Sequence, residues 1–162
     1  MLSEIDMKHL RRCVELAREA VEGGDEPFGS LLVSADGEVL QEDHNRVKDG
    51  DHTQHPEFNL ARWSAANMTE EERQKATMYT SGEHCPMCAA ANGWVGIGRI
   101  VYASSSKQLG EWMQTLGNTP SRVKGLPIED VISDTVVDGP APELAAEIFE
   151  LHVKSKENKQ QK

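Results

Sequence analysis

No apolar run in this sequence of 162 residues approaches the ~18 residues that a membrane-spanning helix needs. The first residues, MLSEID, lack the basic start and the continuous apolar stretch of a secretory signal, and are typical instead of the capped start of an amphipathic helix. These absences argue against a membrane protein and a secreted one. We therefore expect a cytoplasmic protein.

Cysteine is scarce, because the chain has only three, and three cannot all pair as disulfides. Two of them form Cys85-Pro86-Met87-Cys88. In a reducing compartment this spacing favours metal binding or redox chemistry over a structural disulfide. We expect the third, Cys13, in the core.

Basic residues are outnumbered, with 17 Lys and Arg against 27 Asp and Glu and a formal net charge of -10. This charge repels phosphate backbones, and the sequence shows no basic patch to offset it, so we do not expect a nucleic acid partner. Four lysines do fall within residues 154–162, but that segment has no apolar residue. We expect it to be a disordered polar tail.

Residues 1–153 are enough for one domain with its own core. Apolar periodicity and turn signals predict helices over residues 3–22, 56–68, 86–94, 107–116 and 142–153, and strands over residues 28–33, 39–40, 76–80, 99–104 and 135–137. Alternating strands and helices with short connections imply a partly parallel sheet covered on both faces. The predicted fold is α/β: a three-layer α/β/α sandwich with a central mixed sheet of about five strands.

Two short motifs stand at the predicted starts of two helices: His55-Pro56-Glu57 and Cys85-Pro86-Met87-Cys88. Free N–H groups at a helix start stabilise thiolates, which prepares both cysteines to bind a cation such as Zn²⁺. One imidazole and two thiolates make three ligands. A structural zinc site usually has four, whereas three leave a position for a water whose pKa the metal lowers to about 7. We therefore predict a catalytic Zn²⁺ held by His55, Cys85 and Cys88.

Glu57 follows His55 by two residues, so it can reach a metal-bound water without being a ligand. Hydrolytic deamination takes a proton from water and delivers protons to a ring nitrogen and to the departing ammonia, and one carboxylate beside zinc can perform all three transfers. Glu57 is thus the predicted catalytic residue. Cys-x-x-Cys alone also fits a redox pair or half of a structural zinc site. His52 and His84 are competing ligands, but their neighbours offer no matching proton shuttle.

At these residues the chain resembles the cytidine deaminase superfamily, whose signature joins His-x-Glu with Pro-Cys-x-x-Cys. The resemblance extends over most of the chain. Glu26-Pro27-Phe28-Gly29-Ser30 and His44-Asn45-Arg46-Val47 are similar to the glycine-containing strand and the Asn-Arg turn of the guanine, cytosine and tRNA-adenosine deaminase branch. It implies a single zinc-dependent deaminase domain over residues 1–153, one Zn²⁺ per chain and a homodimer.

The resemblance also implies substrate contacts. The asparagine that matches Asn45 contacts the ring in that branch, although an Asx turn closing the hairpin is a compatible reason for it. Glu111 and Trp112 lie where members similar to guanine deaminase carry an acidic residue and an aromatic lid, with an exposed acid and a packed anchor as the alternative. Phe28 is a further candidate, with core packing as its alternative.

Two positions depart from the family pattern. His84 stands where a proline usually precedes the first cysteine, and we expect zinc binding to survive this change. Pro56 replaces the usual alanine of His-x-Glu, so the N–H that commonly contacts a substrate oxygen is missing. We expect the ring to be recognised differently.

The leading hypothesis is an aminohydrolase that releases ammonia from a free nucleobase, a nucleoside or a related aminated heterocycle, with a guanine-type purine favoured. Two alternatives stay open. One is deamination of adenosine in transfer RNA, which uses the same site but needs basic residues to hold the RNA. The other is a non-catalytic zinc-binding scaffold of the same fold, in which Glu57 would serve no purpose.

Overall fold

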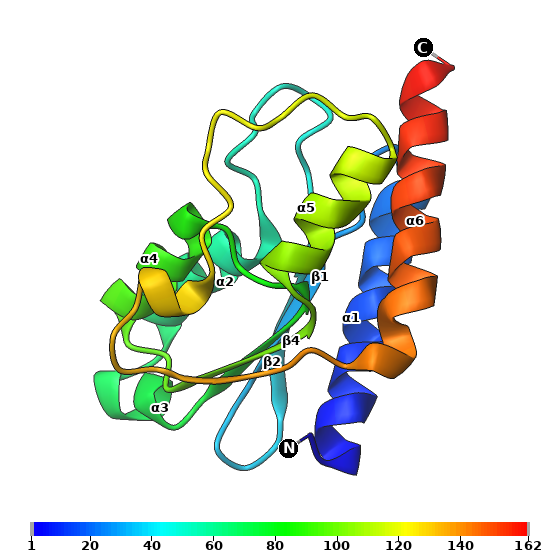
Figure 1. Cartoon of the computed structure of the whole chain (residues 1–162). Coiled ribbons are helices and arrows are strands. Elements are labelled where there is room, and N and C mark those ends of the chain that lie inside the picture. Colours follow the sequence, from blue (N-terminus) through cyan, green and yellow to red (C-terminus); the bar gives the residue numbers. More distant parts are fainter. Residues whose placement is uncertain (1, 162) are drawn as a thin grey trace.

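The computed structural model describes residues 2–161 and shows a sheet with helices on both faces (Figure 1). In this part of the chain the sheet has five strands in the order β2-β1-β3-β4-β5. The strands are β1 (Gly29–Val33), β2 (Val39–His44), β3 (Thr77–Gly82), β4 (Arg99–Ser104) and β5 (Val136–Asp138). β1 pairs antiparallel with β2 and β3, and β4 pairs parallel with β3 and β5. The predicted mixed sheet is confirmed.

Two apolar clusters lie on opposite faces of this sheet. Neighbouring strand residues alternate between them: Leu31 belongs to one and Leu32 to the other, and Tyr79 and Met78 divide in the same way. This is the two-residue period of a strand buried on both faces. The first cluster includes residues of α1 (Glu4–Glu22) and α6 (Pro142–Gln160), and the second includes residues of α2 (Pro56–Asn67) and α4 (Pro86–Val95). The three-layer α/β/α arrangement is thus confirmed.

All the predicted helices and strands are present. At most of their ends, the observed bound differs from the predicted one by a few residues. α5 (Ser106–Thr115) follows β4 and begins with a capping box between Ser105 and Gln108. Two short elements were not predicted: α3 (Glu70–Gln74) and a 3-10 turn at Ile128–Asp130. Both are shorter than the window from which a periodic pattern can be recognised.

The expected disordered tail is wrong for most of residues 154–162, because α6 continues to Gln160. Three hydrogen bonds tie its last turns to the end of α1 and the loop that follows: Ser155 to Asp25, Asn158 to Val21 and Lys159 to Glu26. These partners are distant in sequence, so the local composition could not reveal them. The last residue of the expected tail, Lys162, lies outside the described residues.

A buried ionic contact joins α1 to the sheet. The carboxylate of Asp6 accepts hydrogen bonds from Tyr79 Oη at 2.7 Å and from the two terminal nitrogens of Arg99 at 2.9 and 3.0 Å. Burial alone would raise the pKa of Asp6, but the bonds from Arg99 and Tyr79 hold it well below its usual range. The first helix is therefore fixed by a charge that stays ionised.

Among residues 2–161, no helix combines the length and the apolar character that crossing a membrane requires.

Candidate metal centre and active site

The predicted metal ligands lie at the starts of two helices that pack side by side, α2 and α4. His55 is the N-cap of α2 and Cys85 is the N-cap of α4. Pro56 and Pro86 follow at the first helical position, where a missing N–H costs nothing and the fixed φ suits a helix start. The sequence thus starts both helices at the residues that carry the ligands.

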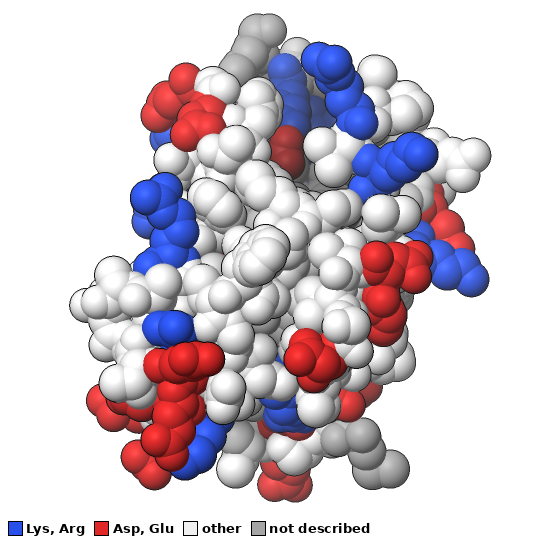
Figure 2. Space-filling view, turned by 90° about the vertical axis from the view of Figure 1, so that its left-hand side faces the viewer, with Lys and Arg blue, Asp and Glu red and all other residues white. Residues whose placement is uncertain are grey.

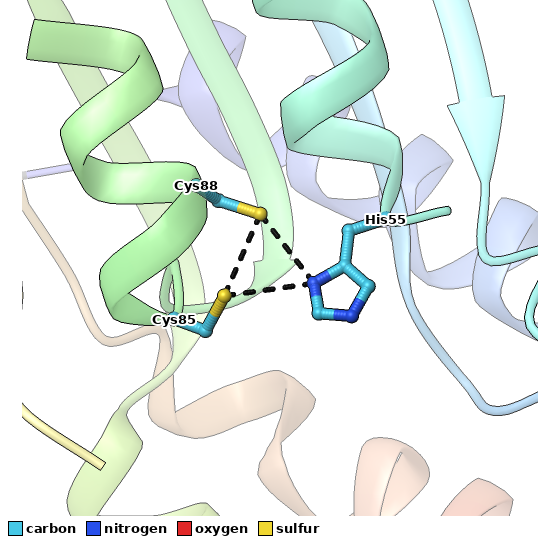
Figure 3. A group of neighbouring side chains, drawn as sticks. All are labelled: His55, Cys85 and Cys88. Atoms are coloured by element: carbon cyan, nitrogen blue, oxygen red, sulfur yellow. Dashed lines mark hydrogen bonds between the residues drawn. The ribbon is translucent and has the colours of Figure 1, made fainter. Parts of the chain in front are cut away.

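Three donor atoms converge at this point (Figure 3). Nδ1 of His55 lies 3.5 Å from Sγ of Cys85 and 3.5 Å from Sγ of Cys88, and the two sulfurs are 3.6 Å apart. A tetrahedral zinc ion with Zn–S of about 2.3 Å and Zn–N of about 2.0–2.1 Å requires about 3.5 Å between N and S and about 3.8 Å between the sulfurs. The triangle therefore fits Zn²⁺, and zinc as the cofactor is confirmed.

No fourth residue of a metal-binding type joins this group among the described residues, so the ligand set leaves one position open. His52 and His84, the competing ligand candidates, are not members of it. His84 is instead fully buried behind Cys85, with 1% of its surface exposed.

The two thiols are electrostatically different. The pKa of Cys85 falls to about 4, first because of its hydrogen bond with the Cys88 thiol and further because His55 lies beside it. The pKa of Cys88 is raised, first because of the same hydrogen bond and further because the thiol is buried. The bond with Cys85 raises the pKa of His55 in turn. Zinc binding displaces the shared proton, since both cysteines bind as thiolates.

Glu57 is buried in the first turn of α2, with 5% of its surface exposed. Its Oε1 accepts hydrogen bonds from Ser30 Oγ at 3.1 Å and from Thr80 Oγ1 at 2.9 Å. Its Oε2 accepts no hydrogen bond from a hydroxyl or a backbone N–H of the described residues. The charge of Glu57 and a hydrogen bond with it contribute to the raised pKa of Cys88, which places the carboxylate beside the triangle of ligands. One carboxylate oxygen is thus anchored and the other is available to the site.

Ser30 and Thr80 are site residues that the sequence did not reveal. They face each other as a register pair on the antiparallel strands β1 and β3, with their hydroxyls 3.0 Å apart. Both are fully buried. The sequence offered one indication of this site: a serine beside Leu31 and Leu32 in an otherwise apolar strand. That pattern does not reveal that the serine contacts Glu57 or Thr80.

Asn45 follows β2 directly and is buried. Its Oδ1 accepts a long hydrogen bond from the N–H of Val47 at 3.4 Å, so the Asx turn is present. Its N–H donates to the carbonyl of Phe28 at 2.9 Å, which joins the turn to the start of β1. The side-chain amide Nδ2 makes no hydrogen bond to a described residue. Contact with a substrate stays a prediction that this free donor allows.

Phe28 and Trp112, which we considered separately, are brought together by His152 of α6. The His152 ring centroid lies 5.5 Å from that of Phe28 and 5.8 Å from that of Trp112, and Trp112 also contacts Phe149. Burial lowers the pKa of His152 to about 4, so the ring is neutral at pH 7. The Phe28 ring also lies against Gly82, where an added Cβ would be 3.2 Å from it.

Glu111 is exposed on α5 and makes no hydrogen bond or ion pair with the described residues. Its neighbour Trp112 turns inward against α6, and successive helical residues are about 100° apart around the axis. The helix that directs Trp112 towards α6 therefore directs Glu111, one residue earlier, to solvent. The structure gives no contact that supports a binding role for Glu111.

The fold and the three-ligand site define a zinc-dependent hydrolytic deaminase. The chain belongs to the family described as "Cytidine and deoxycytidylate deaminase zinc-binding region", whose model matches residues 3–104 and thus includes all three ligands and Glu57. The resemblance to the superfamily is thereby confirmed.

Individual relatives differ in what they act on. The chain is 36% identical over 119 residues to "Probable cytosine deaminase" of Schizosaccharomyces pombe, an alignment that covers 74% of this chain and 72% of that protein. It is 34% identical over 104 residues to "Guanine deaminase" of Bacillus subtilis, covering 63% and 66%. A solved structure from a study of A-to-I editing by tRNA deaminases has a TM-score of 0.63 and 26% identity, covering 90% of this chain and 99% of the other.

Proposed function

We propose that this protein releases ammonia from a free nucleobase, a nucleoside or a related aminated heterocycle, with a guanine-type purine as the leading candidate. The observation that carries the proposal is the placement of Glu57. Its carboxylate lies buried beside the metal ligands, with one oxygen held by the hydroxyls of Ser30 and Thr80 and the other held by neither. A structural zinc site has no use for such a group.

The reaction replaces a ring C–NH₂ by C=O, consuming water and releasing NH₃. His55, Cys85 and Cys88 would hold the zinc ion, which when bound lowers the pKa of a coordinated water to about 7. Glu57 takes a proton from the attacking water at its free oxygen. It delivers this proton to the ring nitrogen, then takes the second proton of the water from the hydroxyl left on the ring carbon and delivers it to the departing amine, so that C=O forms as NH₃ leaves.

The other residues of the site orient these groups. The hydroxyls of Ser30 and Thr80 hold the Glu57 carboxylate in one rotamer, so that its free oxygen points to the reacting atoms. We assign the free amide of Asn45 to a polar edge of the substrate ring. Pro56 offers no N–H, so a donor other than residue 56 must bind the substrate oxygen.

The similarity to the Bacillus subtilis enzyme supports a guanine-type purine, within a resemblance to the branch that joins guanine, cytosine and tRNA-adenosine deaminases, and the Schizosaccharomyces pombe relative keeps cytosine on the panel. Deamination of adenosine in transfer RNA is the second candidate, and the likeness to the tRNA deaminase structure favours it. The net charge of -10 opposes a polyanion as substrate. On the face shown in Figure 2, basic side chains are interspersed with acidic ones and form no continuous basic surface. The small-molecule substrate therefore remains the leading proposal.

We also propose that the protein is a cytoplasmic homodimer. α4 contains no charged residue, and Trp94 near its end is 90% exposed. Figure 2 looks at the side of the molecule where α4 lies in Figure 1, and its centre is broad and uncharged. An exposed tryptophan on such a surface is typical of an interface. Trp94→Glu should convert a dimer to a monomer in light scattering, whereas Val136→Glu on β5 should not.

The cytoplasmic location is proposed because a reducing compartment keeps the thiols of the metal ligands free of disulfides and available to the metal.

The proposed activity is tested with zinc-loaded protein and a panel of aminated purines, pyrimidines, pterins and triazines, with their nucleosides. Ammonia release is measured for the wild type and for Glu57→Gln, and the zinc content of both is determined. Release from one ring class that disappears in a variant retaining zinc would support the deaminase. Silence on the panel, with inosine formed in transfer RNA, would favour the second candidate. Silence in both assays would favour the scaffold.

A further inference from the structure

Three buried polar atoms behind the metal ligands have no hydrogen-bond partner among the described residues: Nδ1 and Nε2 of His84, and Oδ1 of Asn92. His84 immediately precedes Cys85 and is 1% exposed, whereas Asn92 lies inside α4 and is 0% exposed. Unpaired polar atoms in a core are costly, and buried polar groups are nearly always paired. Two such residues beside the same ligand therefore point to a shared role.

The side chains of His84 and Asn92 are neighbours. Burial lowers the pKa of His84, and the charge of Glu57 and the amide of Asn92 beside the imidazole act in the opposite direction. A neutral imidazole carries one donor and one acceptor nitrogen. If its N–H points to Oδ1 of Asn92, directly or through one buried water, two of the three orphaned atoms are satisfied. The other end of Asn92 already donates a long bond to the carbonyl of Ile97 at 3.5 Å.

This pair spans the turn that leads from the sheet into α4. Cys85, Cys88 and Asn92 recur at spacings of three and four, which places them along one face of the helix. A bond from His84 to Asn92 therefore braces the residue before the first ligand against the helix that carries the second.

The residue on the other side of His84 is also fixed. Glu83 donates its N–H to the carbonyl of Ser104 at 2.8 Å, and its carboxylate accepts from the N–H groups of Ser106 and Ile128 at 2.9 and 2.7 Å. The turn is thus held to β4 and α5 by Glu83. Among the described residues Glu83 makes no hydrogen bond to α4, so a link at His84 would join the turn to that helix.

We propose that His84 and Asn92 form a buried hydrogen-bonded pair that positions Cys85 and Cys88 for the zinc ion. Both are positioning residues, since neither belongs to the ligand group. The proposal rests on the zinc centre of the proposed function and not on the identity of the substrate.

The test measures how fast zinc leaves the loaded protein for a chromogenic chelator. His84→Phe and Asn92→Leu keep the volume nearly constant and each removes one partner. Each should release zinc about 10-fold faster or more, as expected for a group that orients metal ligands. The double variant should release zinc no faster than the worse single variant, because its second change removes a bond already lost. Ser155→Ala, which removes a buried hydroxyl on α6, should release zinc as the wild type does.

Unchanged release from both single variants would overturn the proposal, as would fully additive effects in the double variant. If the variants do not fold, long-range ¹H–¹⁵N spectra of the wild type decide the matter. His84 should then show one fixed tautomer with an N–H protected from solvent exchange, and rapidly exchanging tautomers would refute the pair. Neither measurement uses turnover, so a failure here is distinguishable from a failure of the deaminase proposal.

Discussion

Replacing Thr80 by valine tests how the structure holds the catalytic carboxylate. Valine has nearly the shape of threonine but no hydroxyl. Thr80→Val therefore removes the hydroxyl that lies 2.9 Å from Oε1 of Glu57 and 2.9 Å from the carbonyl oxygen of Gly82, to one of which it donates its single proton at a time. The zinc ligands lie on other elements and are not touched by this change.

The size of the effect follows from the partners of Glu57. A hydrogen bond to a charged group contributes about 1.5–3 kcal/mol, which corresponds to roughly 10- to 150-fold in rate. Ser30 still donates to the same oxygen at 3.1 Å, so Thr80→Val should lie near the lower end, with kcat reduced about 10-fold. Ser30→Ala combined with Thr80→Val leaves no hydroxyl on this oxygen and should reduce kcat about 100-fold. KM should change little, because both hydroxyls contact the carboxylate and not the substrate.

The assay is steady-state ammonia release on the ring identified by the substrate panel, with zinc content measured for each variant. Thr77→Val is the matched control, because Thr77 lies on the same strand and its hydroxyl makes no hydrogen bond to a described residue. An unchanged kcat in the double variant would refute the reasoning. So would a rise in KM alone, since that would place the hydroxyls in substrate binding.

Three further predictions concern the metal, the ionic contact and the buried imidazole. The Tm of the zinc-free protein should lie roughly 10 °C below that of the protein at a free zinc concentration about 1,000-fold above Kd. Cys85→Ser should make Tm insensitive to chelator. An equal Tm with and without zinc would contradict a folded-state site. Asp6→Asn should destabilise the protein by about 1.5–3 kcal/mol in urea unfolding at pH 7, because it removes the charge of the Asp6 carboxylate that binds Arg99, while Arg99 keeps its ion pair with Asp138 at 3.0 Å. The depressed pKa of Asp6 means that this stabilisation is present above the pKa of about 3.9 of an unfolded aspartate and is lost as the pH falls below it. The difference between the wild type and the variant should therefore shrink towards pH 3, and a constant difference would contradict the ion pair. The His152 ring should titrate in NMR with a pKa of about 4, and a midpoint near 6.5 would show that it is not buried.

Local pattern was sufficient for the elements and for the identity of the metal ligands. A helix start is encoded within a few residues, and Pro56 and Pro86 mark the two starts that carry His55 and Cys85. The alternation of strands and helices along the chain likewise predicted a sheet covered on both faces. The three ligands converge because the chain topology brings the two helix starts together, and the family signature supplied the pairing that geometry later showed.

The partners of these residues were decided by packing between distant segments. Ser30 and Thr80 meet on Glu57 only because β1 and β3 pair in one register, and a slip of either strand by one residue would turn its hydroxyl to the opposite face. The same holds for the end of α6, whose polar composition predicts disorder while its contacts with the loop after α1 keep it helical.

Sequence by itself therefore determined which three residues converge as metal ligands and which carboxylate we propose as the proton carrier, because both follow from residue type and short spacings. The tertiary structure alone decided what holds that carboxylate, what surrounds His152 and what is left unpaired around His84. The physical reason is the distance along the sequence over which each kind of interaction acts. Helix caps and periodicity act over a few residues, whereas burial, strand register and hydrogen-bond partners depend on segments that meet only when the chain has folded.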